Sequence, residues 1–159
     1  MKKFLVIQTA FIGDVILATA ILEKLHERYP ESSIDFLVRK GNESLFDGHP
    51  FINELFIWDK QHNKLGNLFR LIGKIRKTSY DVVINPHRFF SSGLITWLSK
   101  GREKTGFNKN PLSFCYSHSF NHQLDGIHEV DRNQKLITYL TDHTSAKPKL
   151  YPGLKDEQM

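Results

Sequence analysis

Two short polar segments of this sequence carry residue types that can do chemistry, and each follows a run of apolar residues. The first is Gly13-Asp14, which comes soon after the apolar run that starts at Phe4. A carboxylate there can serve as a general base, and it can equally cap the following helix by accepting hydrogen bonds from free backbone N–H groups. Gly13 permits a tight turn or the close approach of a ligand. The residues alone leave both roles open for Asp14.

The second segment is Asn85-Pro-His-Arg88, which follows a later apolar run. His87 offers an acid–base group, and Arg88 offers a clamp for an anion. Ser91 and Ser92 come just after this segment and add hydroxyl groups that can contact a sugar or a phosphate. A purely structural role stays open as well, because the same polar groups can end a strand and cap the helix that follows.

These segments need a scaffold, and the rest of the chain predicts one. Short apolar runs alternate with amphipathic stretches, which is typical of an α/β protein with a mostly parallel sheet and helices on both faces. Ligands of such open sheets bind at the carboxyl ends of the strands. We therefore expect the two polar segments to lie close together in space. The predicted strands are 4–8, 34–38, 54–58, 81–84, 104–107 and 114–117, and the predicted helices are 14–29, 42–46, 64–78, 89–99 and 127–140.

The charge of the chain favours an anionic partner. The 159 residues carry a formal net charge of +5, and the sequence pI is about 9.3. Such a balance suits a nucleic acid, an acidic membrane surface or a phosphorylated substrate. Two basic segments, 70–77 and 100–109, are either solvated surfaces or attractants for a phosphorylated or membrane-bound acceptor. No run approaches the roughly 20 apolar residues of a spanning helix, so we expect a soluble or at most peripheral protein.

Several common kinds of site are not predicted. The glycine spacings of a dinucleotide fingerprint and of a P-loop are both missing. His118 and His122 lie four residues apart, but in a stretch without helical periodicity, so we expect no metal site. The single cysteine, Cys115, excludes an internal disulfide framework, fits a reducing compartment and is expected to be a small buried residue.

Seven segments follow one another in a recognisable order. They are Phe4-Leu-Val-Ile-Gln8, Ile12-Gly-Asp-Val-Ile-Leu-Ala-Thr-Ala-Ile21, Ile34-Asp-Phe-Leu-Val38, Gly48-His-Pro-Phe-Ile-Asn-Glu-Leu55, Tyr80-Asp-Val-Val-Ile-Asn85, Thr105-Gly-Phe107 and His128-Glu-Val-Asp-Arg132. The ordered set resembles the amino-terminal half of glycosyltransferase family 9, the ADP-heptose:lipopolysaccharide heptosyltransferases. The Gly-Asp turn alone is weak support, but the set spans nearly the whole chain.

The resemblance implies a Rossmann-like parallel sheet with helices on both faces, the amino-terminal domain of a GT-B glycosyltransferase. Residues 1–145 would form the acceptor-binding domain, and the Pro- and Lys-rich residues 146–159 would begin a linker to a donor-binding domain outside this chain. The implied transfer is inverting and metal-independent, with Asp14 as the general base. The implied contacts to the acceptor or the donor sugar are Gly13, His87, Arg88, Ser91 and Ser92.

The resemblance also implies the partners. The donor is a nucleotide sugar such as ADP-heptose, no cofactor is needed, and the acceptor is a phosphorylated lipid A-core oligosaccharide. The protein would work in the cytoplasm, in peripheral contact with the inner membrane of a Gram-negative bacterium. We expect the chain by itself to fold without catalysing transfer, because the donor-binding half lies outside it.

Two other functions stay open. One is a non-catalytic Rossmann-like module that binds a nucleotide or a sugar, since a fold of this class does not by itself fix a function. The other is a nucleic-acid binder, which only the basic pI supports. The basic stretches lack the interleaved aromatic residues of such proteins, so we expect no nucleic-acid partner.

Overall fold

The computed structural model describes residues 1–122 and 126–153. Six strands of this described chain form one sheet in the order β3-β2-β1-β4-β5-β6, and every neighbouring pair is parallel. The parallel α/β sheet predicted from the sequence is thus confirmed. The strands are β1 (Lys3–Gln8), β2 (Ser33–Arg39), β3 (Ile52–Trp58), β4 (Tyr80–Asn85), β5 (Gly101–Phe107) and β6 (His118–Phe120).

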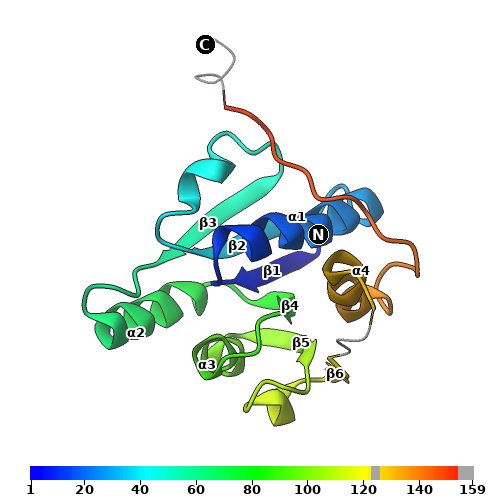
Figure 1. Cartoon of the computed structure of the whole chain (residues 1–159). Helices are drawn as coiled ribbons and strands as arrows, with labels where there is room; N and C mark the ends of the chain where they lie inside the picture. Colours follow the sequence, from blue (N-terminus) through cyan, green and yellow to red (C-terminus); the bar gives the residue numbers. More distant parts are fainter. Residues whose placement is uncertain (123–125, 154–159) are drawn as a thin grey trace.

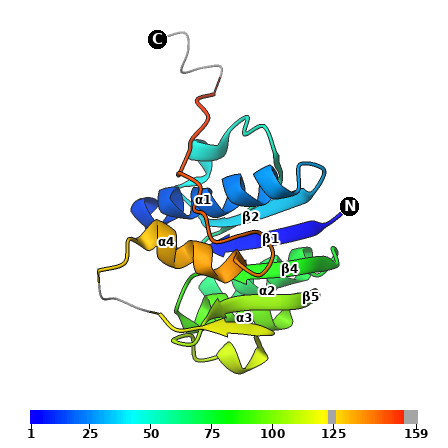
Figure 2. The same cartoon turned by 90° about the vertical axis from the view of Figure 1, so that its right-hand side faces the viewer.

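Helices cover both faces of the sheet (Figure 1; Figure 2). On one face lie α1 and α4, and on the other lie α2 and α3. None of the described helices is long and apolar enough to cross a membrane. The helices are α1 (Ile12–Arg28), α2 (Lys64–Ile75), α3 (Phe90–Leu98) and α4 (Glu129–Gln134), with the short 3₁₀ helices η1 (Glu43–Phe46), η2 (Ser113–Cys115) and η3 (Lys135–Ile137).

Strand β1 lies inside the sheet and is buried on both faces. Successive side chains of a strand point to opposite faces, and Phe4, Leu5, Val6 and Ile7 all have no exposed surface. Phe4 and Val6 pack in the core under α1, whereas Leu5 and Ile7 pack in the core under α2 and α3. The sheet therefore supports a hydrophobic core on each side.

The strand order creates a switch point at the carboxyl edge of β1. From β1 the chain runs outward through β2 and β3, and it then returns to place β4 on the other side of β1. The connections that leave β1 and β4 therefore go to different faces and leave a crevice between them, which is where open sheets of this type bind ligands. The two polar segments of the sequence meet at this edge.

Two predicted elements differ from the structure. The predicted strand at 114–117 is wrong, because η2 occupies the start of this stretch and the edge strand β6 begins only at His118. Phe114 is 71% exposed, so the apolar residues there do not mark a buried strand. The predicted helix at 127–140 is shorter than expected, since α4 ends at Gln134 and gives way to η3.

The residues after η3 run in an extended conformation along α1. The backbone N–H of Lys149 donates to Thr19 Oγ1 at 3.0 Å, and the Tyr151 hydroxyl donates to Glu23 Oε1 at 2.9 Å. Residues 146–153 are thus attached to the domain, and the rest of the predicted linker lies outside the described residues. Its role as a linker stays a prediction.

A buried hydrogen bond ties together the strands on either side of β1. Tyr80 on β4 donates to Asp35 Oδ2 on β2 at 2.6 Å, and both side chains are buried. We expect Tyr80→Phe to lower the free energy of unfolding by about 1–3 kcal/mol, because the buried Asp35 carboxylate loses a donor. The partly exposed control Tyr151→Phe should cost less than about 1 kcal/mol. Urea unfolding measures both losses, and equal losses would contradict this account.

Candidate functional site

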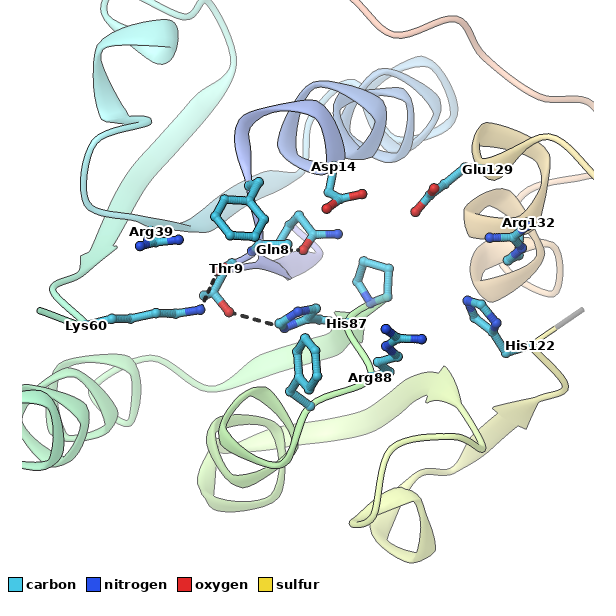
Figure 3. Close-up of a pocket in the computed structure, with 14 residues that line it drawn as sticks. Gln8, Thr9, Asp14, Arg39, Lys60, His87, Arg88, His122, Glu129 and Arg132 are labelled. Atoms are coloured by element: carbon cyan, nitrogen blue, oxygen red, sulfur yellow. Dashed lines mark hydrogen bonds between the residues drawn. The ribbon is translucent and has the colours of Figure 1, made fainter. Parts of the chain in front are cut away.

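A hollow of about 550 Å³ opens at the carboxyl edge of the sheet (Figure 3). Its volume is typical of a site for a small molecule. The segments after β1, β3 and β4, the end of β2 and the start of α4 all contribute to it. The hollow therefore coincides with the switch point of the sheet. Its lining residues are Gln8, Thr9, Ala10, Phe11, Asp14, Arg39, Lys60, Pro86, His87, Arg88, Phe89, His122, Glu129 and Arg132.

Asp14 lies in the first turn of α1 and points into the hollow (Figure 3). The helix begins at Ile12, two residues before the predicted start, and Phe11 takes the N-cap position without a side-chain hydrogen bond. Asp14 is therefore not the N-cap residue, so the capping role that the sequence left open does not apply. From the first turn, its carboxylate still complements the partial positive charge of the helix N-terminus. Within the described chain it makes no hydrogen bond or ion pair, so it is available to a ligand.

His87 lies in the segment after β4 and is held in place by the chain. Its backbone N–H donates to Asn85 Oδ1 at 2.9 Å, and its ring Nδ1 lies 3.4 Å from Thr9 Oγ1. Burial, followed by the nearby charges of Lys60 and Arg88, lowers the pKa of His87 to about 4. The imidazole is therefore neutral at pH 7, and it offers a ligand hydrogen bonds rather than a positive charge.

The two predicted serines do not line the hollow. Ser92 is fully buried, where its hydroxyl donates to the Phe89 carbonyl oxygen at 2.9 Å and accepts from Asn85 Nδ2 at 3.2 Å. It therefore shapes the turn into α3. Ser91 and Gly13 are also not among the lining residues. Of the six predicted site residues, the structure gathers three around the hollow: Asp14, His87 and Arg88.

Three basic residues of the hollow were missed by the sequence reasoning: Arg39, Lys60 and Arg132. Arg39 ends β2, and Lys60 follows β3 by two residues. The rule that found Asp14 could have found both, because each comes at the carboxyl end of a predicted strand. Arg132 lies on α4 near the end of the chain, and only its place in the resembling segment 128–132 singles it out.

Lys60 reaches the hollow from the end of β3. Its Nζ donates to the Thr9 carbonyl oxygen at 2.6 Å and lies 5.0 Å from the centroid of the Trp58 ring. Burial, followed by the charges of Arg39 and Lys64, lowers the pKa of Lys60 to about 8. An anion beside it would raise this pKa again, because an opposite charge favours the charged form. Lys60 is therefore well placed to bind a phosphate group.

Two buried nitrogen atoms on the α4 side of the hollow, Arg132 Nε and His122 Nδ1, have no hydrogen-bond partner within the described chain. Arg132 is only 9% exposed, and its Nη2 donates to the Ile127 carbonyl oxygen at 3.1 Å. Burial, followed by the charge of Arg132 and further cations, lowers the pKa of His122. Buried polar atoms are normally hydrogen-bonded, so the unpaired ones here favour a ligand that pairs with them.

Six charged side chains line the hollow, and none of them forms an ion pair within the described chain. All the ion pairs of that part of the chain join other residues. Figure 3 shows the carboxylates of α1 and α4 pointing toward the same space, with cations to either side. This arrangement suits a ligand that carries both anionic groups and a hydroxyl group. The six residues are Asp14, Arg39, Lys60, Arg88, Glu129 and Arg132.

Metal and thiol chemistry find no support among the described residues. They contain no group of three or more His, Cys, Asp or Glu side chains that could hold a metal ion. Cys115 is partly buried, and burial raises the pKa of its thiol, so it is not an activated nucleophile.

A family model for glycosyltransferase family 9 (heptosyltransferase) matches residues 68–159, more than half of the chain. The chain belongs to glycosyltransferase family 9. Lipopolysaccharide heptosyltransferase 1 of Campylobacter coli is 24% identical over 154 residues, which cover 97% of this chain and 44% of that protein. Lipopolysaccharide heptosyltransferase 3 of Escherichia coli is 28% identical over 137 residues, which cover 82% of this chain and 40% of that protein. The chain thus spans less than half the length of these relatives.

Solved structures of family 9 proteins share the fold. The glycosyl transferase family 9 protein of Veillonella parvula superposes with a TM-score of 0.86 at 24% identity, covering 97% of this chain and 46% of that one. The E. coli ADP-heptose heptosyltransferase II superposes with a TM-score of 0.79 at 20% identity, covering 99% and 49%. The family model begins at Leu68, so it includes the His87 segment and α4 but not the first turn of α1. The catalytic role of Asp14 therefore stays a prediction.

The low pKa of His87 makes the stability of the fold depend on pH. An unfolded histidine has a pKa of about 6.5, so between about pH 6.5 and pH 4 the unfolded chain binds more protons than the folded one. The contribution of His87 to the free energy of unfolding is therefore fully present above pH 6.5, and it is lost as the pH falls to 4. We expect this loss to be about 1–2 kcal/mol after allowance for solvent screening.

Urea unfolding of His87→Asn at several pH values between 4 and 7 measures this contribution. The variant should show a shallower fall in the free energy of unfolding than the wild type. Some slope will remain, because burial also lowers the pKa of His49 to about 4. The exposed His62 supplies the control His62→Asn. A pH slope unchanged by His87→Asn would contradict the assignment.

Proposed function

We propose that this chain is the acceptor-binding, base-carrying half of an inverting, metal-independent glycosyltransferase. The reaction moves heptose or a related sugar from a nucleotide sugar, such as ADP-heptose, to the phosphorylated core of lipopolysaccharide. Membership of family 9 and the names of the relatives support the reaction class. The observation that carries the proposal is the hollow itself, where two carboxylates and four cations meet without an ion pair in the described chain.

Asp14 is the proposed general base. Its carboxylate accepts the proton of the acceptor hydroxyl while that oxygen attacks the anomeric carbon of the donor sugar. The bond from the anomeric carbon to the nucleotide diphosphate breaks on the opposite face, and the diphosphate leaves with the electron pair. This geometry inverts the anomeric centre through an oxocarbenium-like transition state. The lack of a partner for Asp14 within the described chain leaves both of its oxygens free for this step.

The cations of the hollow are the proposed holders of the acceptor phosphates. Arg39 and Lys60 lie on the side of β2 and β3, and Arg88 and Arg132 lie on the side of β4 and α4. Two separated pairs of cations can hold a ligand at two anionic points and fix its orientation, which is what transfer to one particular hydroxyl requires. Glu129, between them, can accept a hydrogen bond from a sugar hydroxyl.

The donor is proposed to bind mainly to a second half of the enzyme. The relatives are about twice as long as this chain, and the solved E. coli heptosyltransferase WaaC contains ADP. Positive groups and helix N-termini of such a half would stabilise the departing diphosphate, so no metal ion is needed. We also propose that the reaction takes place at the cytoplasmic face of the inner membrane. The chain by itself would bind the acceptor without catalysing transfer.

Asp14→Asn tests the proposed base in an enzyme made by joining this chain to the donor-binding half of a family member. We expect transfer to fall by about 10²–10⁴-fold, because proton removal is lost. Acceptor affinity should stay within about threefold, since the amide keeps the shape of the carboxylate and one oxygen that can accept the hydrogen bond of the acceptor hydroxyl. Glu129→Gln is the matched control and should retain much more activity. Near-wild-type transfer by Asp14→Asn, or a larger loss of transfer activity in Glu129→Gln, would contradict the role of Asp14 as the base.

The affinity for the acceptor should depend on the charge of Lys60. Binding of a phosphorylated core oligosaccharide to this chain should weaken by up to about tenfold per pH unit above pH 8, because Lys60 loses its proton there. Lys60→Met should bind about 10–100-fold more weakly at pH 7 and should lose this pH dependence. Titration calorimetry between pH 6.5 and 9.5 measures both effects, with the dephosphorylated oligosaccharide as the control.

The same titrations separate the proposal from its main alternative. If the chain binds a nucleotide but neither form of the oligosaccharide, the proposal is wrong and a non-catalytic nucleotide-binding module is favoured. Equal binding of the phosphorylated and dephosphorylated oligosaccharides would contradict the role given to the four cations.

A further inference from the structure

The outer side of α2 and α3 has an unusual composition. Large apolar side chains are exposed there next to Lys and Arg residues, although residues of this type are mostly buried in soluble domains. Leu65 is 67% exposed, Phe69 59% and Trp97 45%. We name this surface the basic apolar face. Its apolar residues are Leu65, Phe69, Phe90, Trp97 and Phe114, and its basic residues are Lys64, Arg70, Lys74, Arg76 and Lys77.

Contacts between the elements join α2, α3 and η2 within the basic apolar face. Arg76, just after α2, donates through Nη1 to the Leu98 carbonyl oxygen at the end of α3. The Trp97 ring lies 5.7 Å from the Phe114 ring on η2, at an interplanar angle of 73°. Lys104 Nζ on β5 donates to the Trp97 carbonyl oxygen at 3.0 Å. Figure 1 shows α2 and α3 side by side on the same side of the sheet.

The net positive charge of the protein is concentrated in this part of the chain. The segment from Lys64 to Arg102 contains eight Lys and Arg residues and a single acidic residue, Asp81, for a net charge of +7. The remaining residues include fourteen basic and sixteen acidic ones, for a net charge of −2. The Asp81 carboxylate already has partners: Oδ2 accepts a hydrogen bond from the Lys3 backbone N–H at 2.8 Å, and Oδ1 lies 3.9 Å from Arg102 Nη1. The segment itself supplies no further carboxylate, and from outside it Asp59 lines a small hollow together with Arg70 and Lys74.

We propose that the basic apolar face rests on an anionic lipid bilayer. Its aromatic and aliphatic side chains would enter the boundary between headgroups and acyl chains, while its Lys and Arg side chains would bind lipid phosphates. A nucleic acid fits less well, because it uses cations and stacking rings but gains little from an exposed aliphatic side chain such as Leu65.

The basic apolar face lies next to the hollow, so the bilayer contact would bring a membrane-anchored acceptor close to it. Phe89 lines the hollow, and the next residue, Phe90, belongs to the face, so the hollow opens beside the proposed bilayer contact. An acceptor anchored in the bilayer by its lipid would present its sugars next to the hollow. This use rests on the proposed function, whereas the bilayer contact itself does not.

Sedimentation of this 159-residue chain with vesicles tests the contact. The double variant Lys74→Glu/Lys77→Glu reverses two exposed charges on the basic apolar face. The matched control Lys147→Glu/Lys149→Glu reverses two exposed charges on the extended segment along α1, so both variants have the same net charge. On vesicles containing phosphatidylglycerol, we expect the first to bind at least about tenfold more weakly than the wild type and the control less than about threefold. Equal losses would overturn the proposal.

The apolar part of the contact has its own test. Phe69→Ser should weaken binding to the same vesicles by about fivefold, because an inserted ring is removed while the charge is unchanged. Undiminished binding by Phe69→Ser, or wild-type binding as tight to neutral phosphatidylcholine vesicles as to anionic ones, would overturn the proposal. So would a wild-type chain that does not sediment with anionic vesicles.

The bilayer contact and the proposed function can fail separately. The vesicles contain neither acceptor nor donor, so their result does not depend on transfer. In the enzyme joined to a donor-binding half, Lys74→Glu/Lys77→Glu should slow transfer to a vesicle-embedded acceptor by about tenfold and to a delipidated soluble acceptor by less than about twofold. Equal slowing with both acceptors would contradict the proposed use of the contact. Failure of the wild-type enzyme to transfer to either acceptor would contradict the proposed function alone.

Discussion

The structure depends on one strand that is shielded on both sides. The four apolar residues of β1, Phe4 to Ile7, alternate between the two hydrophobic cores, and none of them has exposed surface. The parallel neighbours β2 and β4 pair with β1 on its two edges. Since the chain must leave β1 and β4 toward different faces, none of the described segments closes the space above their carboxyl ends. The place of the hollow is therefore fixed by the burial of β1.

The polar groups buried at the hollow lower the stability of the fold, whereas the burial of β1 raises it. Burying His87 and Lys60 disfavours their charged forms and lowers both pKa values. Arg132 Nε lies buried without a partner in the described chain, which is costly in a folded domain. The chain offsets part of this cost with backbone acceptors, such as the Thr9 carbonyl oxygen that binds Lys60. Groups kept in this condition are typical of functional sites, where a ligand supplies the missing partner.

The fold was largely predictable, because strands buried on both faces appear in a sequence as short apolar runs. The predicted strand at 114–117 is wrong because Phe114 is apolar but exposed, and composition alone does not distinguish a buried run from a surface one. Helix α1 also begins two residues before its predicted start. Apolar periodicity marks the buried part of a helix, whereas the first turn of α1 is exposed at Phe11 and Ile12.

The site was predictable only in part, for a related reason. Asp14, His87 and Arg88 stand close to strand ends in the sequence, so the topology of a parallel sheet is enough to bring them together. Glu129 and Arg132 reach the hollow because α4 packs beside α1, which is a tertiary contact between segments far apart in the chain. The position of Ser92 in the sequence suggested a ligand contact, but its hydroxyl group is hydrogen-bonded within the turn into α3.

The sheet also separates opposite charges in space. Asp14 and Glu129 belong to helices on one face, while the segment with a net charge of +7 includes both helices of the other face. The molecule therefore carries an electric dipole moment directed across the sheet. A charged surface exerts a torque on such a dipole before any contact forms. A negatively charged surface would therefore orient the protein with the α2 and α3 face toward it. This alignment acts over a distance of about 8 Å at physiological ionic strength, and added salt shortens that distance.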